Sequence, residues 1–384
     1  MASTIYLDYA AATPVSDEVF SAMKPYFSEA FYNPSALYEP AVLVRNAYEQ
    51  ARHDLAIAIG AKQHEIIVTA GASESINLAL RGIIAEYGGY VACAGIEHLA
   101  VLETAKELGF QDIAVSEKGL VTADAVRQAI TADTTIVSVG FINNELGTIQ
   151  PLKDISEVVS FERQRRLRDG EQRPLLLHTD ASQASGLIDC SVSRLGVDMM
   201  TLNAAKCYGP KQVGLLWVKA GLRLHPIVTG GSQELSIRAG TENVAGTVGF
   251  AYALSQATAM RKDESTRLAK LRDMLETGIT SSITEAIVNG HNKRRAPHIL
   301  HISVPGLDGE RAVFALDQSG VLAATGSACA ANSGLRSHVL IAAGFDDIHA
   351  DGSLRFSLGR YTSQDEIEHA IPIIVEVITR ELAL

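Results

Sequence analysis

The 384-residue sequence contains one tryptophan, only four cysteines and no long run of apolar or basic residues. Irregular spacing of the cysteines argues against a disulfide framework and against a Cys-x-x-Cys zinc site. The formal net charge is -11, and the longest basic stretch is the short segment Arg163 to Arg168. Binding to nucleic acid or to an anionic membrane therefore has no electrostatic support. Small molecules and other proteins are the expected partners.

Signals for export and membrane insertion are also absent. No segment is apolar over the roughly 20 residues that a bilayer-spanning helix needs. The N-terminus has no basic region followed by an apolar core. We therefore expect a cytoplasmic protein with no membrane partner.

The chain does contain ample apolar material, at 47% of its residues, which is enough for a large core. Between residues 65 and 218 short apolar runs alternate with helix-like stretches, which predicts an α/β fold with a largely parallel sheet. Ligands bind such sheets at the carboxyl ends of the strands. The first candidates are therefore the polar residues that follow these runs: Ser73, His98, Asn144 and Asp180.

The pattern changes near residue 251. A long helical stretch is followed by a strand-like segment over 298–304 and by a closing helix from Gln364. This change predicts a large domain over residues 13–250 and a smaller α+β domain formed by residues 1–12 and 251–384.

Three segments carry residue types suited to a phosphorylated pyridine cofactor. Gly71-Ala-Ser-Glu-Ser would bring backbone N–H groups to a helix N-terminus, where phosphate binds, although it could equally be an ordinary cap. Asp180 ends an apolar strand and could keep a pyridine nitrogen protonated, or could simply cap the next helix. Lys206 follows another strand, where a desolvated amine can bond to a carbonyl cofactor, although most lysines are solvated surface charges.

The order of several motifs resembles that of the cysteine desulfurases, which belong to the class V aminotransferase group of fold-type I pyridoxal-phosphate enzymes. The matching motifs are Gly71-Ala-Ser-Glu-Ser, Glu97-His98, Asn143-Asn-Glu-Leu-Gly, Asp180-Ala-Ser-Gln183 and Lys206-x-Tyr-Gly-Pro. The resemblance extends from Tyr6 to the segment that begins at Arg355. It implies a mostly parallel, seven-stranded sheet in the large domain, pyridoxal 5'-phosphate as cofactor, and a homodimer.

The resemblance also implies a role for each matching residue. Lys206 corresponds to the lysine that carries the cofactor, Asp180 to the partner of the ring nitrogen, and His98 to the catalytic imidazole stacked on the ring. Asn144 and Gln183 would hydrogen-bond the phenolic oxygen of the ring. The phosphate would be bound by Ala72, Ser73, Asn203 and, from the partner subunit of the dimer, Thr241.

Cys329 is the cysteine with unusual surroundings, because it lies in a run of small residues that favours an accessible loop. It matches the family's cysteine that takes sulfur from L-cysteine as a persulfide and passes it to an acceptor protein, either an iron-sulfur scaffold or a tRNA-thiolation enzyme. No resident metal is expected, although Cys329 could contact an iron-sulfur cluster transiently. Arg355 matches the arginine that binds the substrate carboxylate, and Asn33 could assist. The other cysteines are interpreted as small buried side chains: Cys93, Cys190 and Cys207.

The segment before the lysine departs from the family pattern, because Asn203-Ala-Ala-Lys206 replaces Ser-x-His-Lys. Asn203 can still donate a hydrogen bond to phosphate, whereas the side chain of Ala205 cannot. We expect cofactor retention to be weaker by one net hydrogen bond to a charged group, roughly 1.5 to 3 kcal/mol. Alternative functions are a selenocysteine lyase, another class V lyase or aminotransferase, and a catalytically silent binding protein. Cys329 favours the desulfurase, because an aminotransferase does not need it.

Overall fold

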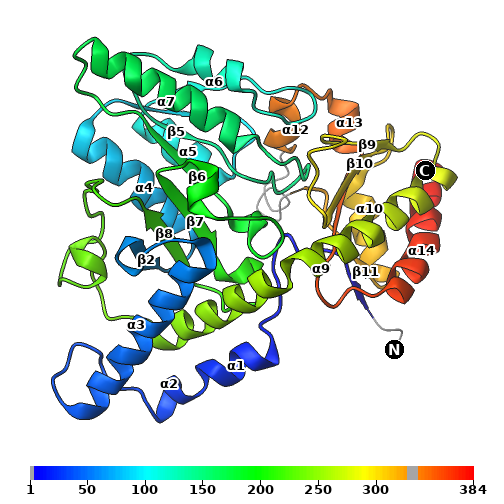
Figure 1. The fold of residues 1–384 in the computed structure, drawn as a ribbon. Helices are drawn as coiled ribbons and strands as arrows, with labels where there is room; N and C mark the ends of the chain where they lie inside the picture. Colours follow the sequence, from blue (N-terminus) through cyan, green and yellow to red (C-terminus); the bar gives the residue numbers. More distant parts are fainter. Residues whose placement is uncertain (1–3, 327–335) are drawn as a thin grey trace.

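The computed structural model describes residues 4–326 and 336–384, so Cys329 lies outside the described residues. A large part built on a seven-stranded sheet adjoins a smaller part built on short sheets, and the 39-residue helix α9 (Val244–Ser282) runs from one to the other (Figure 1).

The large sheet has the strand order β2-β8-β7-β6-β5-β3-β4. Only β8 is antiparallel to its two neighbours, so the predicted seven-stranded, mostly parallel sheet is confirmed. Its strands are β2 (Ile66–Thr69), β3 (Tyr90–Cys93), β4 (Phe110–Asp112), β5 (Thr134–Ser138), β6 (Leu176–Asp180), β7 (Met199–Asn203) and β8 (Gly214–Val218).

Helices cover both faces of this sheet because its central strands are apolar on both sides. Val68, Ala92 and Val137 point into one hydrophobic cluster with helices α3 (Glu39–Ile59), α7 (Leu152–Arg168) and α9. Ile67 and Val91 point into a second cluster with α4 (Ala72–Tyr87) and α5 (Leu99–Leu108). Alternating side chains therefore bury both faces, as expected for a parallel sheet between helical layers.

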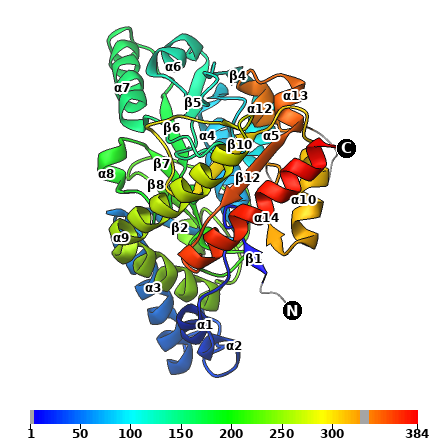
Figure 2. The same cartoon turned by 90° about the vertical axis from the view of Figure 1, so that its right-hand side faces the viewer.

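The smaller part contains the antiparallel sheet β12-β10-β9 and the parallel pair β1-β11. The antiparallel sheet lies beside α9, α10 (Gly309–Gln318) and α14 (Gln364–Leu382) (Figure 2). Side chains of its strands belong to one hydrophobic cluster with residues of these helices: Leu300, Ile302, Leu354 and Phe356. The strands are β1 (Ile5–Tyr6), β9 (Ile287–Val288), β10 (Ile299–Ser303), β11 (Val321–Leu322) and β12 (Ser353–Ser357).

The helices begin at local signals that the sequence contains. Ser363 and Glu366 form a capping box at the start of α14, the closing helix that the sequence predicts from Gln364.

No helix within the two described ranges is long and apolar enough to span a bilayer. The remaining α-helices are α1 (Asp17–Met23), α2 (Pro25–Ser28), α3 (Glu39–Ile59), α4 (Ala72–Tyr87), α5 (Leu99–Leu108), α6 (Ala123–Ala129), α7 (Leu152–Arg168), α8 (Val192–Leu195), α10 (Gly309–Gln318), α12 (His338–Ala342), α13 (Asp347–Asp351) and α14 (Gln364–Leu382).

Helix α9 is continuous across the predicted domain boundary at residue 250. Its residues up to Ala257 pack into the core of the large sheet, and those from Leu268 onward pack into the core of the small part. The division into residues 13–250 against 1–12 and 251–384 stays a prediction.

Candidate active site

A cavity of about 310 Å³ lies at the carboxyl ends of the parallel strands. This volume is within the usual range for small-molecule sites. The segments that follow β2, β3, β5, β6 and β7 all contribute to its walls, and Arg355 reaches it from β12 in the small part. The predicted residues that line it are Ala72, Ser73, His98, Asn144, Asp180, Gln183, Asn203, Lys206 and Arg355.

The start of helix α4 forms one wall of the cavity. Gly71 precedes the helix with a φ of 129°, a conformation that favours glycine, and no side chain caps the first turn. Gly214 lies against it so closely that an added Cβ would approach the Gly71 carbonyl carbon to 2.7 Å. The first N–H groups of α4, next to Ala72 and Ser73, are therefore left to bind a phosphate.

The side chain of Lys206 is held at the cavity by the N-terminal segment of the chain. Its Nζ donates hydrogen bonds to the carbonyl oxygens of Ala10 at 2.8 Å and Ala11 at 2.6 Å. The amide Nε2 of Gln183 donates to the same Ala10 oxygen at 2.9 Å. Lys206 and Gln183 therefore face the cavity side by side.

Asp180 ends β6, where its Oδ1 accepts a hydrogen bond from the backbone N–H of Ser182 at 2.9 Å. Beneath it lies His178, which hydrogen-bonds Ser138 at 2.9 Å and Thr201 at 3.0 Å. Burial lowers the pKa of His178 to about 4, so this imidazole is neutral. Asp180 thus presents its carboxylate to the cavity from a rigid strand end, with no positive charge on the histidine below.

His98 caps helix α5, because its Nδ1 accepts a hydrogen bond from the N–H of Ala100 at 3.1 Å. Burial is the main cause that lowers the pKa of His98. The negative charge of Asp180 raises this pKa, and the positive charge of Lys206 lowers it. The adjacent Glu97 is buried and accepts from the N–H of Gly140, yet burial still raises its pKa to about 8. At neutral pH the cavity therefore contains a neutral imidazole next to a protonated carboxyl group.

Asn144 and Asn203 line the cavity through side chains with few internal bonds. Asn203 Oδ1 accepts from the N–H of Ala205 at 3.2 Å, which leaves its Nδ2 as a donor. The backbone oxygen of Asn144 accepts from Arg355 Nη1 at 3.0 Å. Ala205 does not line this cavity.

Arg355 is only 1% exposed and pairs with Asp8, whose Oδ1 lies 2.7 Å from Nη2. Nη1 and Nη2 each use one N–H on these internal partners, so with respect to residues 4–326 and 336–384 each retains one N–H for a ligand. A fork of two donors on a buried arginine suits a carboxylate.

Two predicted site residues lie away from this cavity. Asn33 is exposed, and its Oδ1 accepts from the N–H of Ser35 at 2.9 Å. Thr241 lines a different pocket, together with Tyr48 of α3. Their assigned roles stay predictions, as does that of Cys329.

The other cysteines are buried, as the sequence predicts. Burial raises the pKa of the Cys190 and Cys207 thiols to about 12 and that of Cys93 well above its usual value. None of these thiols is a nucleophile at neutral pH. Within residues 4–326 and 336–384 no group of three or more His, Cys, Asp or Glu side chains could hold a metal ion.

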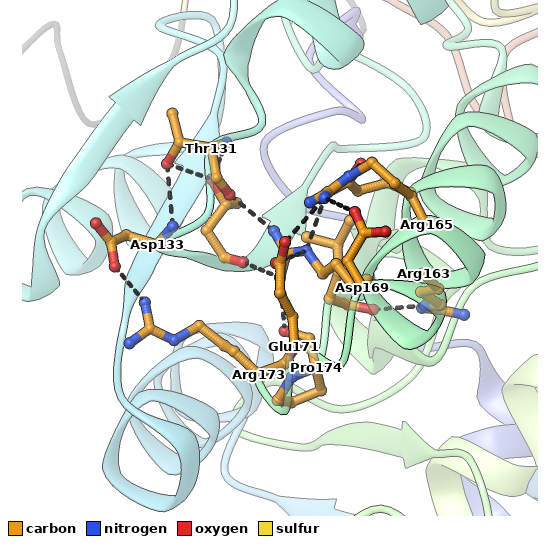
Figure 3. Close-up of polar contacts among 12 residues, drawn as sticks. Thr131, Asp133, Arg163, Arg165, Asp169, Glu171, Arg173 and Pro174 are labelled. Atoms are coloured by element: carbon orange, nitrogen blue, oxygen red, sulfur yellow. Dashed lines mark hydrogen bonds and ion pairs between the residues drawn. The ribbon is translucent and has the colours of Figure 1, made fainter.

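Three of the four arginines in the basic stretch near the end of α7 are bound to acidic side chains of the same chain. Arg165 contacts Asp169 at 2.7 Å and Glu171 at 2.8 Å, and Arg163 pairs with Asp198 (Figure 3). Arg166 is buried and contacts Glu162 at 3.0 Å. These arginines stabilise the chain locally and do not form an open basic surface.

The donors and acceptors around the cavity fit pyridoxal phosphate. An uncapped helix N-terminus suits the phosphate, Asp180 the ring nitrogen, the neutral His98 the ring face, and Lys206 the aldehyde carbon. Together with the seven-stranded sheet, this set of residues defines a fold-type I pyridoxal-phosphate enzyme.

Comparisons with known proteins identify the family. The family model of class V aminotransferases matches residues 5–369. "Cysteine desulfurase IscS" of Dictyoglomus turgidum is 38% identical, with 99% of this chain and 96% of that protein covered. "Cysteine desulfurase IscS 1" of Archaeoglobus fulgidus is also 38% identical, with 98% and 97% covered.

Solved structures give the same result. A NifS-like protein superimposes with a TM-score of 0.89 at 30% identity, covering 98% of this chain and all of that one. The structure titled "SspA in complex with cysteine" has a TM-score of 0.80 at 32% identity, covering 94% and 100%. The chain belongs to the class V aminotransferases, within the cysteine desulfurase family, and depends on pyridoxal phosphate.

Sequence reasoning missed the part of the site that comes from the N-terminal segment. Asp8 contacts Arg355 across 347 positions of the sequence, and the carbonyl oxygens of Ala10 and Ala11 contact Lys206 across 196 and 195 positions. Only Asp8 carried a usable signal, as a charged residue next to the apolar Leu7.

Proposed function

We propose that this protein removes the sulfur atom from L-cysteine, releases L-alanine and passes the sulfur through a persulfide on Cys329 to an acceptor protein in the cytoplasm. The proposal is supported above all by the meeting of Lys206, Asp180, His98 and Arg355 at one cavity in a chain of this family. An iron-sulfur scaffold or a tRNA-thiolation enzyme would be the acceptor.

The chain's own residues would divide the work as follows. Arg355 binds the substrate carboxylate through its two remaining Nη donors, and Asp180 keeps the ring nitrogen of the cofactor protonated. Lys206 Nζ removes the proton from the substrate Cα and returns a proton later. When bound, pyridoxal phosphate supplies a conjugated ring that takes up the electrons released at Cα.

The sulfur step needs a thiolate at Cys329 and no external oxidant. Its sulfur attacks the substrate sulfur, and the bond between that sulfur and the substrate Cβ breaks with its electron pair left on carbon. A proton then joins that carbon, so that alanine leaves and the enzyme retains a persulfide. The neutral imidazole of His98 can accept the thiol proton.

A homodimer is supported by the concentration of exposed apolar side chains in one segment of the chain. Six large apolar side chains between residues 20 and 43 are each at least 54% exposed, and exposed apolar side chains that gather together mark interaction sites. They belong to α1, α2, α3 and the loop between α2 and α3 (Figure 1). Thr241 lines a pocket together with Tyr48 of α3, which fits a contact with the cofactor phosphate of the partner subunit. The six side chains are Phe20, Phe27, Phe31, Leu37, Tyr38 and Leu43.

The decisive experiment is to give L-cysteine and a reductant to the cofactor-loaded protein and to measure alanine and sulfide. Equal amounts of both products from the wild type, and neither from Lys206→Ala, are expected. Cys329→Ser should retain the absorbance of the lysine-bound cofactor and form no persulfide. Unchanged turnover in Cys329→Ser would refute the persulfide route.

Subunit exchange tests the dimer. Lys206→Ala and Thr241→Ala chains, each of low activity alone, should regain activity when refolded together, because a mixed dimer contains one site with both residues intact. No recovery in mixed dimers would contradict the role of Thr241.

A further inference from the structure

The small sheet presents a polar face toward the cavity, opposite the face that packs into its hydrophobic cluster. On β10 and β12 this face carries Ser303, His301, Ser353 and Arg355. His301 and Arg355 are direct partners across the two antiparallel strands, so their side chains leave the sheet on the same side. In such pairs the Cβ atoms lie about 4.5 to 5.5 Å apart.

Three buried polar atoms on this face lack a hydrogen-bond partner within the part of the chain that the structure describes. They are Nε of Arg355, Nε2 of His301 and Oδ1 of Asn289. Their residues are 1%, 1% and 5% exposed, so water does not replace the missing partners cheaply. Two of these atoms, Nε of Arg355 and Nε2 of His301, belong to residues that lie directly opposite each other, and they call for a common explanation.

The remaining contacts of His301 decide which of its nitrogens carries the proton. Its Nδ1 lies 2.9 Å from the side-chain amide of Asn289, which also lies 2.7 Å from Ser303 Oγ. The oxygen and nitrogen of an asparagine amide are assigned from their surroundings. With the oxygen turned toward His301 and Ser303, it accepts from Nδ1–H and from the serine hydroxyl, and Nε2 keeps a free lone pair.

The positive charge of Arg355 favours the tautomer of His301 that carries its proton on Nδ1. Burial, together with the charge of Arg355, lowers the pKa of His301 to about 3, so the ring has one donor and one acceptor nitrogen. An N–H at Nε2 would face a guanidinium group that can only donate. A lone pair there complements it.

We propose that His301 is a positioning residue for Arg355: its Nε2 accepts the Nε–H of the guanidinium, and Asn289 fixes the required tautomer. Side-chain rotation is sufficient to close the contact, because the strand register already places the two residues opposite each other. With Nε held from the sheet side, Asp8 and the Asn144 carbonyl hold one N–H on each Nη. The two remaining Nη donors then face a carboxylate in a fixed plane. The inference rests on the proposed role of Arg355 in binding the substrate carboxylate.

A pair of substitutions separates this role from general packing. In His301→Gln, the far end of the side chain can still accept a hydrogen bond near the position of Nε2. In His301→Asn, only the near contact with Asn289 remains. For the cofactor-loaded protein we expect His301→Asn to raise KM for L-cysteine about tenfold, the effect of one hydrogen bond to a charged group, with kcat nearly unchanged. His301→Gln should stay close to the wild type.

Cysteamine, which lacks the carboxylate, supplies a second readout. Its titration, followed by cofactor absorbance, should be the same in the wild type and both variants. The inference is overturned if His301→Asn leaves KM unchanged, if His301→Gln is no better, or if cysteamine binding weakens equally. If His301→Asn does not fold, Asn289→Ala replaces it as the test variant. Asn289→Ala should also raise KM for L-cysteine, and an unchanged KM overturns the inference.

The variant Arg355→Lys separates the proposed role of Arg355 in carboxylate binding from the role of His301 in positioning it. A raised KM in Arg355→Lys with no effect of His301→Asn defeats the inference alone. An unchanged KM in Arg355→Lys defeats the proposed role of Arg355, and the inference with it.

Discussion

The buried ion pair between Arg52 of α3 and Glu234 makes the strongest stability prediction. Glu234 accepts hydrogen bonds from Arg52 Nη1 and Nη2 at 2.6 Å, from Tyr48 at 2.5 Å and from the N–H of Val68 at 2.6 Å. Arg52 and Glu234 are each 5% exposed. Glu234→Leu removes the buried carboxylate that pairs with the guanidinium and leaves it only the half-exposed Glu49 as an ion partner, and loss of such a buried partner costs about 3 to 5 kcal/mol of unfolding free energy.

Backbone strain places the expected loss in the lower half of that range. Glu234, Leu235 and Ser236 have φ values of 43°, 61° and 63°, and each such residue costs on the order of 1 kcal/mol or more. Release of Glu234 allows part of this strain to relax. The same relaxation would move the segment that leads to Thr241, so cofactor retention should fall as well if Thr241 contacts the cofactor phosphate of the partner subunit as proposed.

Urea unfolding of the cofactor-free protein, followed by fluorescence, measures the loss. Trp217 is the only tryptophan, is 4% exposed and lies on β8, which pairs with β2 next to the ion pair. Glu49→Gln is the matched control, because Glu49 contacts the same arginine from a 46% exposed position and should cost less than about 1 kcal/mol. The reasoning is refuted if Glu234→Leu costs no more than this control. The reasoning is also refuted if the double variant Arg52→Met/Glu234→Leu recovers none of the unfolding free energy that Glu234→Leu loses.

Two further predictions concern the cofactor cavity. Burial raises the pKa of Glu97 from 4.5 to about 8, so the native state retains a proton that the unfolded chain releases, and stability declines as pH rises between these values. The variant Glu97→Gln has no carboxyl group to titrate and lacks this decline. The melting temperature of the variant minus that of the wild type should therefore rise between pH 5.5 and pH 8.5. A difference that stays constant over this range would contradict the raised pKa of Glu97. Ala205→His should bind pyridoxal phosphate about tenfold more tightly if its imidazole reaches the phosphate, and equal affinity in a cofactor titration would count against the predicted weak retention.

The sequence predicted the large sheet well because its central strands are apolar on both faces. It missed β4, whose three residues lie at the sheet edge, are not buried and include only one apolar side chain, Phe110, so they carry a weak apolar signal. The residues that follow strands could be predicted as a site, because parallel strands all point their carboxyl ends the same way. Asp180, His98 and Lys206 meet at one cavity for this reason.

The rest of the site depends on contacts that residue type does not reveal. The carbonyl oxygens of Ala10 and Ala11 bind Lys206 through the backbone, which every alanine possesses. The pairing of Arg355 with His301 depends on the register of β10 and β12, and the sequence of either strand alone does not specify it.

The N-terminal segment has a practical consequence for anyone who prepares the protein. Asp8 binds Arg355, and the carbonyl oxygens of Ala10 and Ala11 bind Lys206, so residues 8–11 belong to the candidate site even though they precede every helix that the structure describes. We expect an affinity tag or a protease cut close to residue 8 to disturb the contacts of Arg355 and Lys206 together. A tag at the other terminus, after α14, avoids this segment.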